Sequence, residues 1–296
     1  MASLRDLRMR MRAVRQTLQV TKAMNLISTS KLRRGRRMLE DTEPYFTRIQ
    51  KSMFDILSYA DKLDSDFFRK KESEDFRTAI VVITSDKGLA GAYNANVFRY
   101  VNDFCKKAEN PMLLLVGAIG HRHYAHASDA ILERFSFHSR LPTMEDAEEV
   151  AEYVISRYLR GEIDEVHVVY THMYNAIKIL PTEKQVLPLD AEKIQAELSD
   201  TGNEKRVKIH FEFIPSEREV FDALVPRYIK GIIYGSMVEA YASEHSARMT
   251  AMSQASKNAE EMLADLQVMY NRMRQSGITQ EMAEIVGGSA ALAGKS

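Results

Sequence analysis

A long C-terminal segment, roughly residues 216–286, most constrains what this chain can fold into. It contains no proline after Pro226 and no glycine between Gly235 and Gly277, so it favours a single uninterrupted helix. Apolar residues along it alternate at spacings of three and four, a pattern typical of a coiled-coil seam. The members of this predicted seam are Met252, Ala255, Ala259, Met262, Leu266, Met269 and Met273. At about 1.5 Å per residue such a helix is on the order of 100 Å long, and we expect it to need a partner helix.

The N-terminal segment carries a matching pattern. The same alternation is found at Leu4, Leu7, Met11, Val14 and Leu18, and it continues on a shifted stripe with Met24 and Ile27. We expect this segment to be helical to about residue 59. Because both segments flank one central region, they must pair antiparallel, and helical rise places residue 18 opposite about residue 256.

The last twenty or so residues of the C-terminal helix then have no partner within the chain. They include Ile278, Met282, Ile285 and Val286, followed by a stretch of small residues. A single helix that exposes apolar side chains is unstable in water. We therefore expect this tip to be enclosed by another protein.

Between the two helical segments the hydrophobic period changes. The expected strands are 79–83, 112–116, 131–137, 165–170, 177–189 and 207–214, and the expected helices are 91–109, 120–127 and 143–159. Continuous Val, Ile and Leu strands that alternate with helices predict an α/β fold with a mostly parallel, Rossmann-like sheet and antiparallel strands at its end. The expected division is an N-terminal coiled-coil helix over 1–60, a central α/β domain over 61–215, and a C-terminal coiled-coil helix with a protruding tip over 216–296.

Charge is unevenly distributed along the chain, although the formal net charge is zero. Residues 1–37 contain eleven Lys or Arg and one acid, Asp6. This excess fits a mitochondrial presequence, a patch for nucleic acid or acidic lipid, or the solvated face of a helix. No run approaches the roughly 18 apolar residues that span a membrane, and no signal peptide is expected. The single cysteine, Cys105, excludes an internal disulfide.

Two clusters look like sites of chemistry but match no known spacing. The turn Ser85–Gly91 follows a strand and precedes a helix, as phosphate-binding loops do, yet it fits neither the dinucleotide-binding nor the P-loop motif. The alternative is a tight turn available to a protein partner. His121, His123 and His126 suggest a metal site, but residues two apart on a helix point about 200° apart and no carboxylate or cysteine completes the set.

Three stretches are more specific than these patterns. They are VTKAMNLISTSKLRR at residues 20–34, ITSDKGLAGAYNANV at 83–97, and the segment 242–292, which ends in ITQEMAEIVGGSAAL. In this order and spacing they resemble the gamma subunit of F-type ATP synthases. The resemblance covers essentially the whole chain.

The resemblance implies a central-stalk rotor that couples proton-driven rotation of a membrane c-ring to ATP synthesis or hydrolysis in a ring of alpha and beta subunits. The chain would be an antiparallel coiled coil inserted in that ring, with an α/β domain resting on the epsilon subunit and the c-ring. It would be present in a single copy, peripheral to the cytoplasmic face of the cell membrane in a bacterial-type complex, with the mitochondrial matrix as the alternative location. The basic N-terminus then belongs to the shaft rather than to a presequence.

The resemblance implies no catalysis, cofactor, metal or nucleic-acid binding by the chain itself. The alternative function is an α/β nucleotide-binding enzyme module with a coiled-coil appendage. The sequence lacks a convergent set of acid, base, nucleophile or metal ligands, which argues against this alternative.

The resemblance also implies contact residues, position by position. Arg274, Gln275, Thr279 and Gln280 match positions that hydrogen-bond the catch loops of the beta subunits, and Lys22 and Met24 match positions that face the acidic lever of beta. Asp86, Lys87 and Ala90 lie in a loop that approaches the same lever, with Ala90 where some members have cysteine. Phe211 and Glu212 resemble the foot that meets the c-ring and epsilon, although Ile214 stands where some members have an acid.

Overall fold

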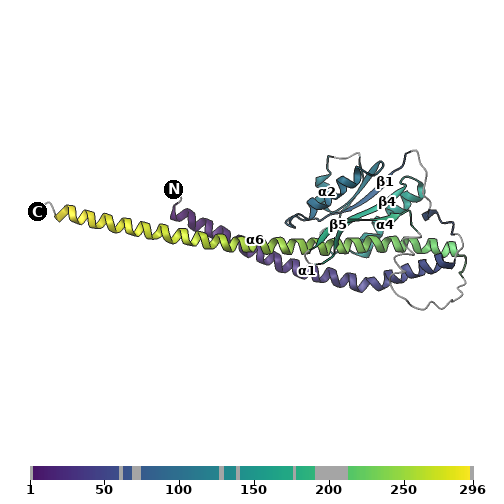
Figure 1. The fold of residues 1–296 in the computed structure, drawn as a ribbon, viewed down its shortest axis with the longest axis horizontal. Coiled ribbons are helices and arrows are strands. Elements are labelled where there is room, and N and C mark those ends of the chain that lie inside the picture. The colour runs from purple at the N-terminus through teal and green to yellow at the C-terminus, as the bar shows by residue number, and fades with distance from the viewer. Residues whose placement is uncertain are drawn as a thin grey trace. The chain divides into compact units, whose positions relative to one another are not determined.

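The computed structural model describes residues 3–59, 63–68, 75–126, 130–137, 141–175, 178–190 and 213–293. The chain forms two compact units: unit 1 is Met1–Ser28 with Met249–Ser296, and unit 2 is Thr29–Arg248. Two long helices, α1 (Leu4–Tyr59) and α6 (Glu217–Ala293), each contribute residues to both units (Figure 1). Each unit therefore combines parts of the predicted segments, and each has its own apolar core.

Unit 2 is built around a five-stranded sheet in the order β3-β2-β1-β4-β5. The strands are β1 (Thr78–Ile83), β2 (Pro111–Val116), β3 (Ile131–Phe135), β4 (Glu165–Met173) and β5 (Ile179–Leu187). β1 pairs in parallel with β2 and β4, β2 pairs in parallel with β3, and β4 pairs antiparallel with β5. The predicted, mostly parallel sheet with an antiparallel end is confirmed. The strand expected at 207–214 lies largely outside the described residues.

Helices connect the parallel strands, as parallel pairing requires. They are α2 (Tyr93–Cys105), α3 (Ala118–His123) and α4 (Met144–Arg160), and a short 3-10 helix, η1 (Asp66–Phe68), precedes the sheet. α4 begins at a capping box formed by Thr143 and Asp146, and it ends at Gly161, whose φ of 75° is left-handed. These local signals explain why α4 lies within one residue of its predicted bounds.

Both faces of the sheet are covered by helices (Figure 1). All six residues of β1 are buried, and successive side chains point to opposite faces. Val81 belongs to a core shared with α4 and with the unit 2 segments of α1 and α6, whereas Ile80 and Val82 pack against α2. The carboxyl ends of β1 and β2 therefore lie close to α6, whose Met237 and Tyr241 line one cavity with residues that follow these strands.

Two glycines allow α1 and α6 to approach closely within unit 2. A Cβ at Gly35 would lie 3.2 Å from Cδ1 of Tyr241. A Cβ at Gly231 would lie 2.2 Å from Cδ1 of Phe46, so the aromatic ring occupies the space that a side chain would need. α1 continues as a helix through Gly35 and Pro44.

Unit 1 is an antiparallel pair of helical segments, as expected. Nη2 of Arg8 donates to the hydroxyl of Tyr270 at 2.6 Å, Ser256 donates to Thr21 at 2.8 Å, and Nδ2 of Asn25 donates to the Met249 carbonyl at 3.0 Å. These contacts agree with the predicted register to within one helical turn, since side chains on both helices lean toward their N-termini.

The predicted seam of α6 is confirmed at Met252, Ala259 and Leu266, which are buried, and at Met273, which packs on the same cluster, but it is wrong at two positions. Met262 and Met269 are exposed, and Leu263 and Tyr270 pack instead beside the buried Leu266. A seam through Met262 and Met269 and a seam through Leu263 and Tyr270 both keep spacings of three and four. The sequence pattern alone therefore does not show which pair packs on α1. On α1, Ile27 is likewise exposed, and the buried positions near it are the polar Thr21 and Ser28.

Among the described residues, no helix combines the length and the apolar character that crossing a membrane would require.

Candidate functional site

The loop after β1, residues 84–92, presents an exposed turn on a fixed base. Leu89 has a φ of 62° and Gly91 a φ of 58°, both in the left-handed region. A leucine rarely adopts this conformation, which therefore needs support from its surroundings. Part of that support is local: the Ser85 amide donates to Oδ1 of Asn94 at 3.1 Å, and Oγ of Ser85 donates to the Lys87 carbonyl at 2.9 Å.

The base of the loop is tied to the turn after β2. Oγ1 of Thr84 donates to the Val116 carbonyl at 2.9 Å and accepts from the Gly120 amide at 3.0 Å. A Cβ at Gly117 would lie 2.3 Å from the Thr84 carbonyl oxygen, and the φ of Gly117 is 100°, so only glycine fits there. Oδ1 of Asp86 accepts from the amide of Ala118 at 3.0 Å.

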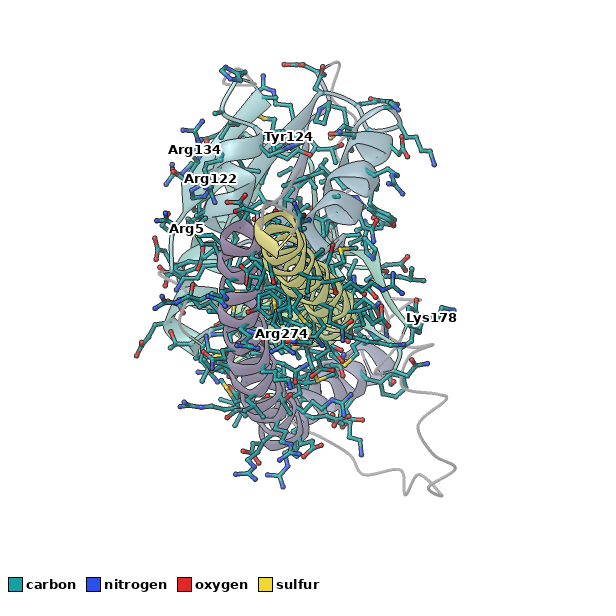
Figure 2. The ribbon with its side chains drawn as sticks, turned by 90° about the vertical axis from the view of Figure 1, so that its left-hand side faces the viewer. Arg5, Arg122, Tyr124, Arg134, Lys178 and Arg274 are labelled. Carbon is teal, nitrogen blue, oxygen red and sulfur yellow. The ribbon has the colours of Figure 1, made fainter. Side chains whose placement is uncertain are left out.

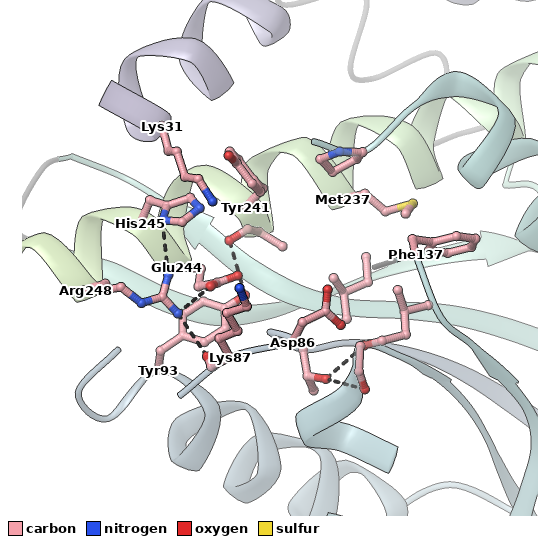
Figure 3. A pocket seen from close by; sticks show the side chains of 16 residues that line it. Lys31, Asp86, Lys87, Tyr93, Phe137, Met237, Tyr241, Glu244, His245 and Arg248 are labelled. Atoms are coloured by element: carbon pink, nitrogen blue, oxygen red, sulfur yellow. Dashed lines mark hydrogen bonds and ion pairs between the residues drawn. The ribbon is translucent and has the colours of Figure 1, made fainter. Parts of the chain in front are cut away.

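α6 fastens the exposed end of the same loop through Arg248 (Figure 3). Nη2 of Arg248 donates to the carbonyl oxygens of Lys87 at 2.9 Å and Gly88 at 3.0 Å, and it lies 2.6 Å from Oε1 of Glu244. Nη1 of Arg248 lies 3.1 Å from Nδ1 of His245. The Arg248 side chain is only 7% exposed. We call Arg248, Glu244 and His245, with the two loop carbonyls, the clamp.

Burial controls the charge states of the clamp. Burial raises the pKa of Glu244, although the charge of Arg248 opposes this effect. Burial, followed by the positive charges of Arg248 and Lys31, lowers the pKa of His245 to about 3. His245 is therefore neutral near pH 7, and its Nδ1 can accept a hydrogen bond from Arg248. The clamp thus combines one buried cation with one charged and several neutral acceptors.

The sequence reasoning did not select the clamp residues. Glu244 and Arg248 stand four positions apart in ASEHSAR, within a stretch used only for the resemblance. Their spacing places both side chains on one face of the helix, but it does not show that this face is buried.

A cavity of about 90 Å³ lies beside the clamp, near the carboxyl ends of β1 and β2. Its walls include Lys31, Asp86, Phe137, Met237 and Tyr241 (Figure 3). Nucleotides in α/β folds bind outside the carboxyl ends of the strands. Here α6 covers that position.

The backbone amides at the start of α3, in the turn after β2, are engaged within the chain. The Ala118 amide donates to Asp86, and the Ile119 amide donates to the Ser85 carbonyl at 3.0 Å. In the loop after β1, the Ser85 amide donates to Asn94. This arrangement supports the reading of the loop as a structural turn with an exposed tip.

The three histidines of the candidate metal cluster have separate environments. Nε2 of His121 lies 3.0 Å from the Leu115 carbonyl oxygen, His123 stacks on Phe98 with ring centroids 3.7 Å apart, and His126 is exposed. Within the described part of the chain, no group of three His, Cys, Asp or Glu is arranged to hold a metal ion.

The predicted contact residues of the tip are all exposed in unit 1. These residues are Arg274, Gln275, Thr279 and Gln280, and Figure 2 labels Arg274 on α6. Thr279 donates to the carbonyl of Gln275 at 3.0 Å, and Gln280 donates to Glu284 at 3.3 Å. Within the described residues Arg274 has no acceptor in this chain.

The other predicted contact residues have varied surroundings. Lys22 forms an ion pair with Glu260 at 2.6 Å, both side chains being about half exposed, and Met24 is half-buried. In the loop after β1, Lys87 is exposed and Asp86 is half-buried, but Ala90 is buried in unit 2, so Leu89 supplies the exposed apolar side chain. Phe211 and Glu212 lie outside the described residues.

Comparison with known proteins identifies the family. A family model described as ATP synthase matches residues 3–292. The chain is 39% identical over 292 residues to the ATP synthase gamma chain of Ruminiclostridium cellulolyticum, which covers 98% of this chain and 99% of that relative. The chain belongs to the ATP synthase gamma family. It is also 35% identical over 300 residues to the sodium-ion-specific ATP synthase gamma chain of Acetobacterium woodii, which covers 98% of this chain and 99% of that one.

Chains in solved structures of mitochondrial ATP synthases share the fold. A chain of the Euglena gracilis mitochondrial ATP synthase (OSCP/F1/c-ring, rotational state 3) has a TM-score of 0.66 at 17% identity, covering 99% of this chain and 96% of that one. A chain of the Tetrahymena thermophila mitochondrial ATP synthase (central stalk and c-ring) has a TM-score of 0.61 at 24% identity, covering 80% of this chain and 99% of that one. The expected identity as an ATP synthase gamma subunit is confirmed, as is the expected fold.

Proposed function

We propose that this chain is the non-catalytic rotor of an ATP synthase, which couples ion-driven rotation of a membrane c-ring to catalysis in a ring of alpha and beta subunits. The relatives are named as gamma chains, and the solved neighbours belong to F1, c-ring and central-stalk assemblies. The observation that carries the proposal is the exposed tip of α6. Beyond its contacts with α1, it leaves the apolar Ile278, Met282, Ile285 and Val286 at least half exposed.

The absence of catalysis by the chain itself is part of the proposal. Two of the charged groups around the cavity serve the fold: Arg248 belongs to the clamp, and Asp86 accepts from the amide of Ala118 in the turn after β2. A catalytic site needs an acid, base or nucleophile that is free to meet a substrate. The enzyme-module alternative therefore has no observation in its favour.

The two parts of the tip have different roles in this proposal. Arg274, Gln275, Thr279 and Gln280 hydrogen-bond loops of the beta subunits, since a guanidinium and amides act directionally. The apolar residues beyond them form a bearing that turns within the ring, because apolar contact has little dependence on angle. Lys22 and Met24 face the acidic lever of beta.

The loop after β1 is the contact of unit 2 with the same lever. Its exposed Lys87 and Leu89 meet the partner, and the clamp prevents the loop from yielding. A force applied to the loop is therefore passed to α6 through Arg248. Arg248 is in this sense a positioning residue, which acts on the partner only through the loop that it holds.

The remaining partners and the location complete the proposal. The chain is present in one copy, its α/β part rests on the epsilon subunit and the c-ring, and the complex lies at the cytoplasmic face of the cell membrane. Phe211 and Glu212 form the foot of this contact.

Co-expression of the chain with alpha and beta subunits from a homologous operon tests the proposal. Native mass spectrometry should find one copy of this chain in a complex with the catalytic ring, and single-molecule imaging should show it turning during ATP hydrolysis. The chain alone should neither hydrolyse ATP nor bind Mg-ATP in calorimetric titration. Micromolar affinity of the lone chain for Mg-ATP would contradict the proposal. So would a complex of the other subunits that, without this chain, keeps its full rate of ATP hydrolysis and its full coupling.

A further inference from the structure

His167 in β4 is buried, and both nitrogens of its ring face carboxylates. Nδ1 lies 2.7 Å from Oε2 of Glu183 in β5, and Nε2 lies 3.2 Å from Oε1 of Glu165 in β4. The His167 side chain is 9% exposed, compared with 27% for Glu165 and 36% for Glu183. A buried imidazole is thus held between carboxylates from two neighbouring strands.

The two contacts determine where the proton lies. A neutral imidazole donates through one nitrogen and carries a lone pair on the other, so one contact would set a lone pair against a carboxylate oxygen. An imidazolium donates through both nitrogens and satisfies both acceptors. A proton on one glutamate is the alternative, but a carboxyl group ordinarily loses its proton about two pH units below imidazole. The geometry therefore favours the charged ring.

The elements packed around His167 reinforce this state. On β1, the residue paired with His167 is the apolar Ile80. On α2, the centroid of the Phe104 ring lies 4.9 Å from that of the imidazole. Also on α2, burial and then the charge of Glu183 raise the pKa of Tyr100, which places this neutral phenol near the same carboxylate.

Burial and charge act on His167 in opposite directions. Burial lowers the pKa of His167, but the hydrogen bonds and negative charges of Glu165 and Glu183 together outweigh it, so the pKa is raised. Among the described residues, these two carboxylates are the charged groups that act on the ring.

We infer that His167 is a proton-dependent latch, which as an imidazolium ties the edge strand β5 to β4 beside α2. β5 stands at the end of the strand order, so within the described residues β4 is its sheet partner. The His167–Glu183 contact joins the middle of β5 to the amino-terminal part of β4. If His167 lost its proton, β5 would keep its backbone hydrogen bonds to β4 but would lose this side-chain ion pair.

The turn end of the same hairpin is fastened separately. Oε1 of Glu239 in α6 lies 2.6 Å from Nδ1 of His172 and accepts from the Met173 amide at 3.2 Å. These contacts hold the β4 residues that pair with residues 179 and 180 of β5, so release of the latch should loosen residues 183–187 more than residues 179–181. The sign follows from linkage: the stabilisation is complete below the ordinary histidine pKa of about 6.5 and is lost as the pH rises through the higher folded-state value.

The experiment is an NMR titration of the imidazole carbon-bound protons in the full chain, with the His167 signal assigned through His167→Gln. The matched variant is Glu183→Gln, which keeps the shape and a neutral acceptor, and the control is the exposed His126→Gln. We expect His167 in the parent chain to titrate above 6.5, Glu183→Gln to lower its midpoint, and His126→Gln to leave it unchanged. A His167 midpoint at or below 6.5, or one that Glu183→Gln does not move, overturns the latch.

Hydrogen exchange gives a second readout on the same proteins. After correction for the intrinsic pH dependence, exchange at residues 183–187 of the parent should increase several-fold between about pH 6 and pH 9, and residues 179–181 should change less. Glu183→Gln should remove this difference in pH dependence. Equal pH dependence at both ends of β5 in the parent chain would also contradict the latch.

Discussion

Arg248 and Glu244 lie one turn apart on α6, and their side chains meet at 2.6 Å inside unit 2, where Arg248 also holds the carbonyl oxygens of Lys87 and Gly88. A buried ion pair offsets the cost of removing its charges from water only if its remaining hydrogen-bonding groups find partners. Here the loop carbonyls and His245 provide them. The buried guanidinium of Arg248 therefore has hydrogen-bond partners, and through two of them it fixes an exposed loop.

Removing the arginine should be costly. Arg248→Ala leaves Glu244 buried without its cation, and we expect it to lower the free energy of unfolding of unit 2 by about 3–5 kcal/mol. Glu244→Ala combined with Arg248→Ala should cost less than the sum of the single changes, because the unpaired charge is removed as well. Urea denaturation of the full chain measures these differences.

The control for the clamp is Arg227→Ala, an exposed arginine on the same helix, which should change stability by less than about 0.5 kcal/mol. Arg248→Lys keeps the charge but loses the planar fork, so it should stabilise the loop less well than arginine does. If Arg248→Ala is no more destabilising than Arg227→Ala, the clamp has no structural role.

His245 predicts a pH dependence in unit 2. Its pKa is lowered to about 3 in the folded chain, so the unfolded chain binds the proton more readily. Stability from this group is present above the ordinary histidine pKa of about 6.5 and is lost as the pH falls toward 3. His245→Asn should flatten the decline in the urea midpoint between about pH 6.5 and pH 4. His126→Gln should leave the decline intact, and the same decline in His245→Asn would refute the assignment.

The packed face of unit 1 can be tested with two adjacent residues. Leu263 packs beside the cluster of Leu7, Met11 and Leu266, whereas Met262 is 44% exposed. Leu263→Ala should destabilise the helix pair by about 1–2 kcal/mol, less than the 2–5 kcal/mol of a fully buried leucine, and Met262→Ala should have little effect. Hydrogen exchange over residues 4–18 measures both. The reverse order of effects would support the seam predicted from the sequence.

Much of the fold was accessible from the sequence because its signals are local and strong. The buried β1, the capping box at Thr143 and the left-handed Gly161 each specify an element without reference to the rest of the chain. The seam of α6 was harder. Met262 and Leu263 are both apolar and fit spacings of three and four equally well, so only contact with α1 decides between them.

The site was less predictable than the fold. The exposed tip residues and the loop were found through the resemblance, but Arg248 was not, because a sequence does not show that a charged residue is buried. His167 was missed for the same reason. Its partners are one residue of its own strand and one residue of β5, and only strand pairing brings Glu183 to the ring.

The roles proposed along the tip lead to a final prediction. Arg274 and Gln275 are exposed and follow the last α6 residues that pack on α1, so they are the first polar side chains free to meet a surrounding subunit. A charge-assisted hydrogen bond contributes about 1.5–3 kcal/mol, so Arg274→Ala combined with Gln275→Ala should reduce ATP hydrolysis by the assembled complex roughly tenfold or more.

Truncation of residues 285–296 removes mainly apolar bearing surface, whose contact has little angular preference. It should weaken assembly yet leave appreciable turnover and rotation in the complexes that form. The measurement is ATP hydrolysis and coupling in purified complexes of matched composition. If the double substitution leaves both unchanged while the truncation abolishes them, directional contacts at Arg274 and Gln275 do not couple the rotor to the ring, and the apolar end of the helix does.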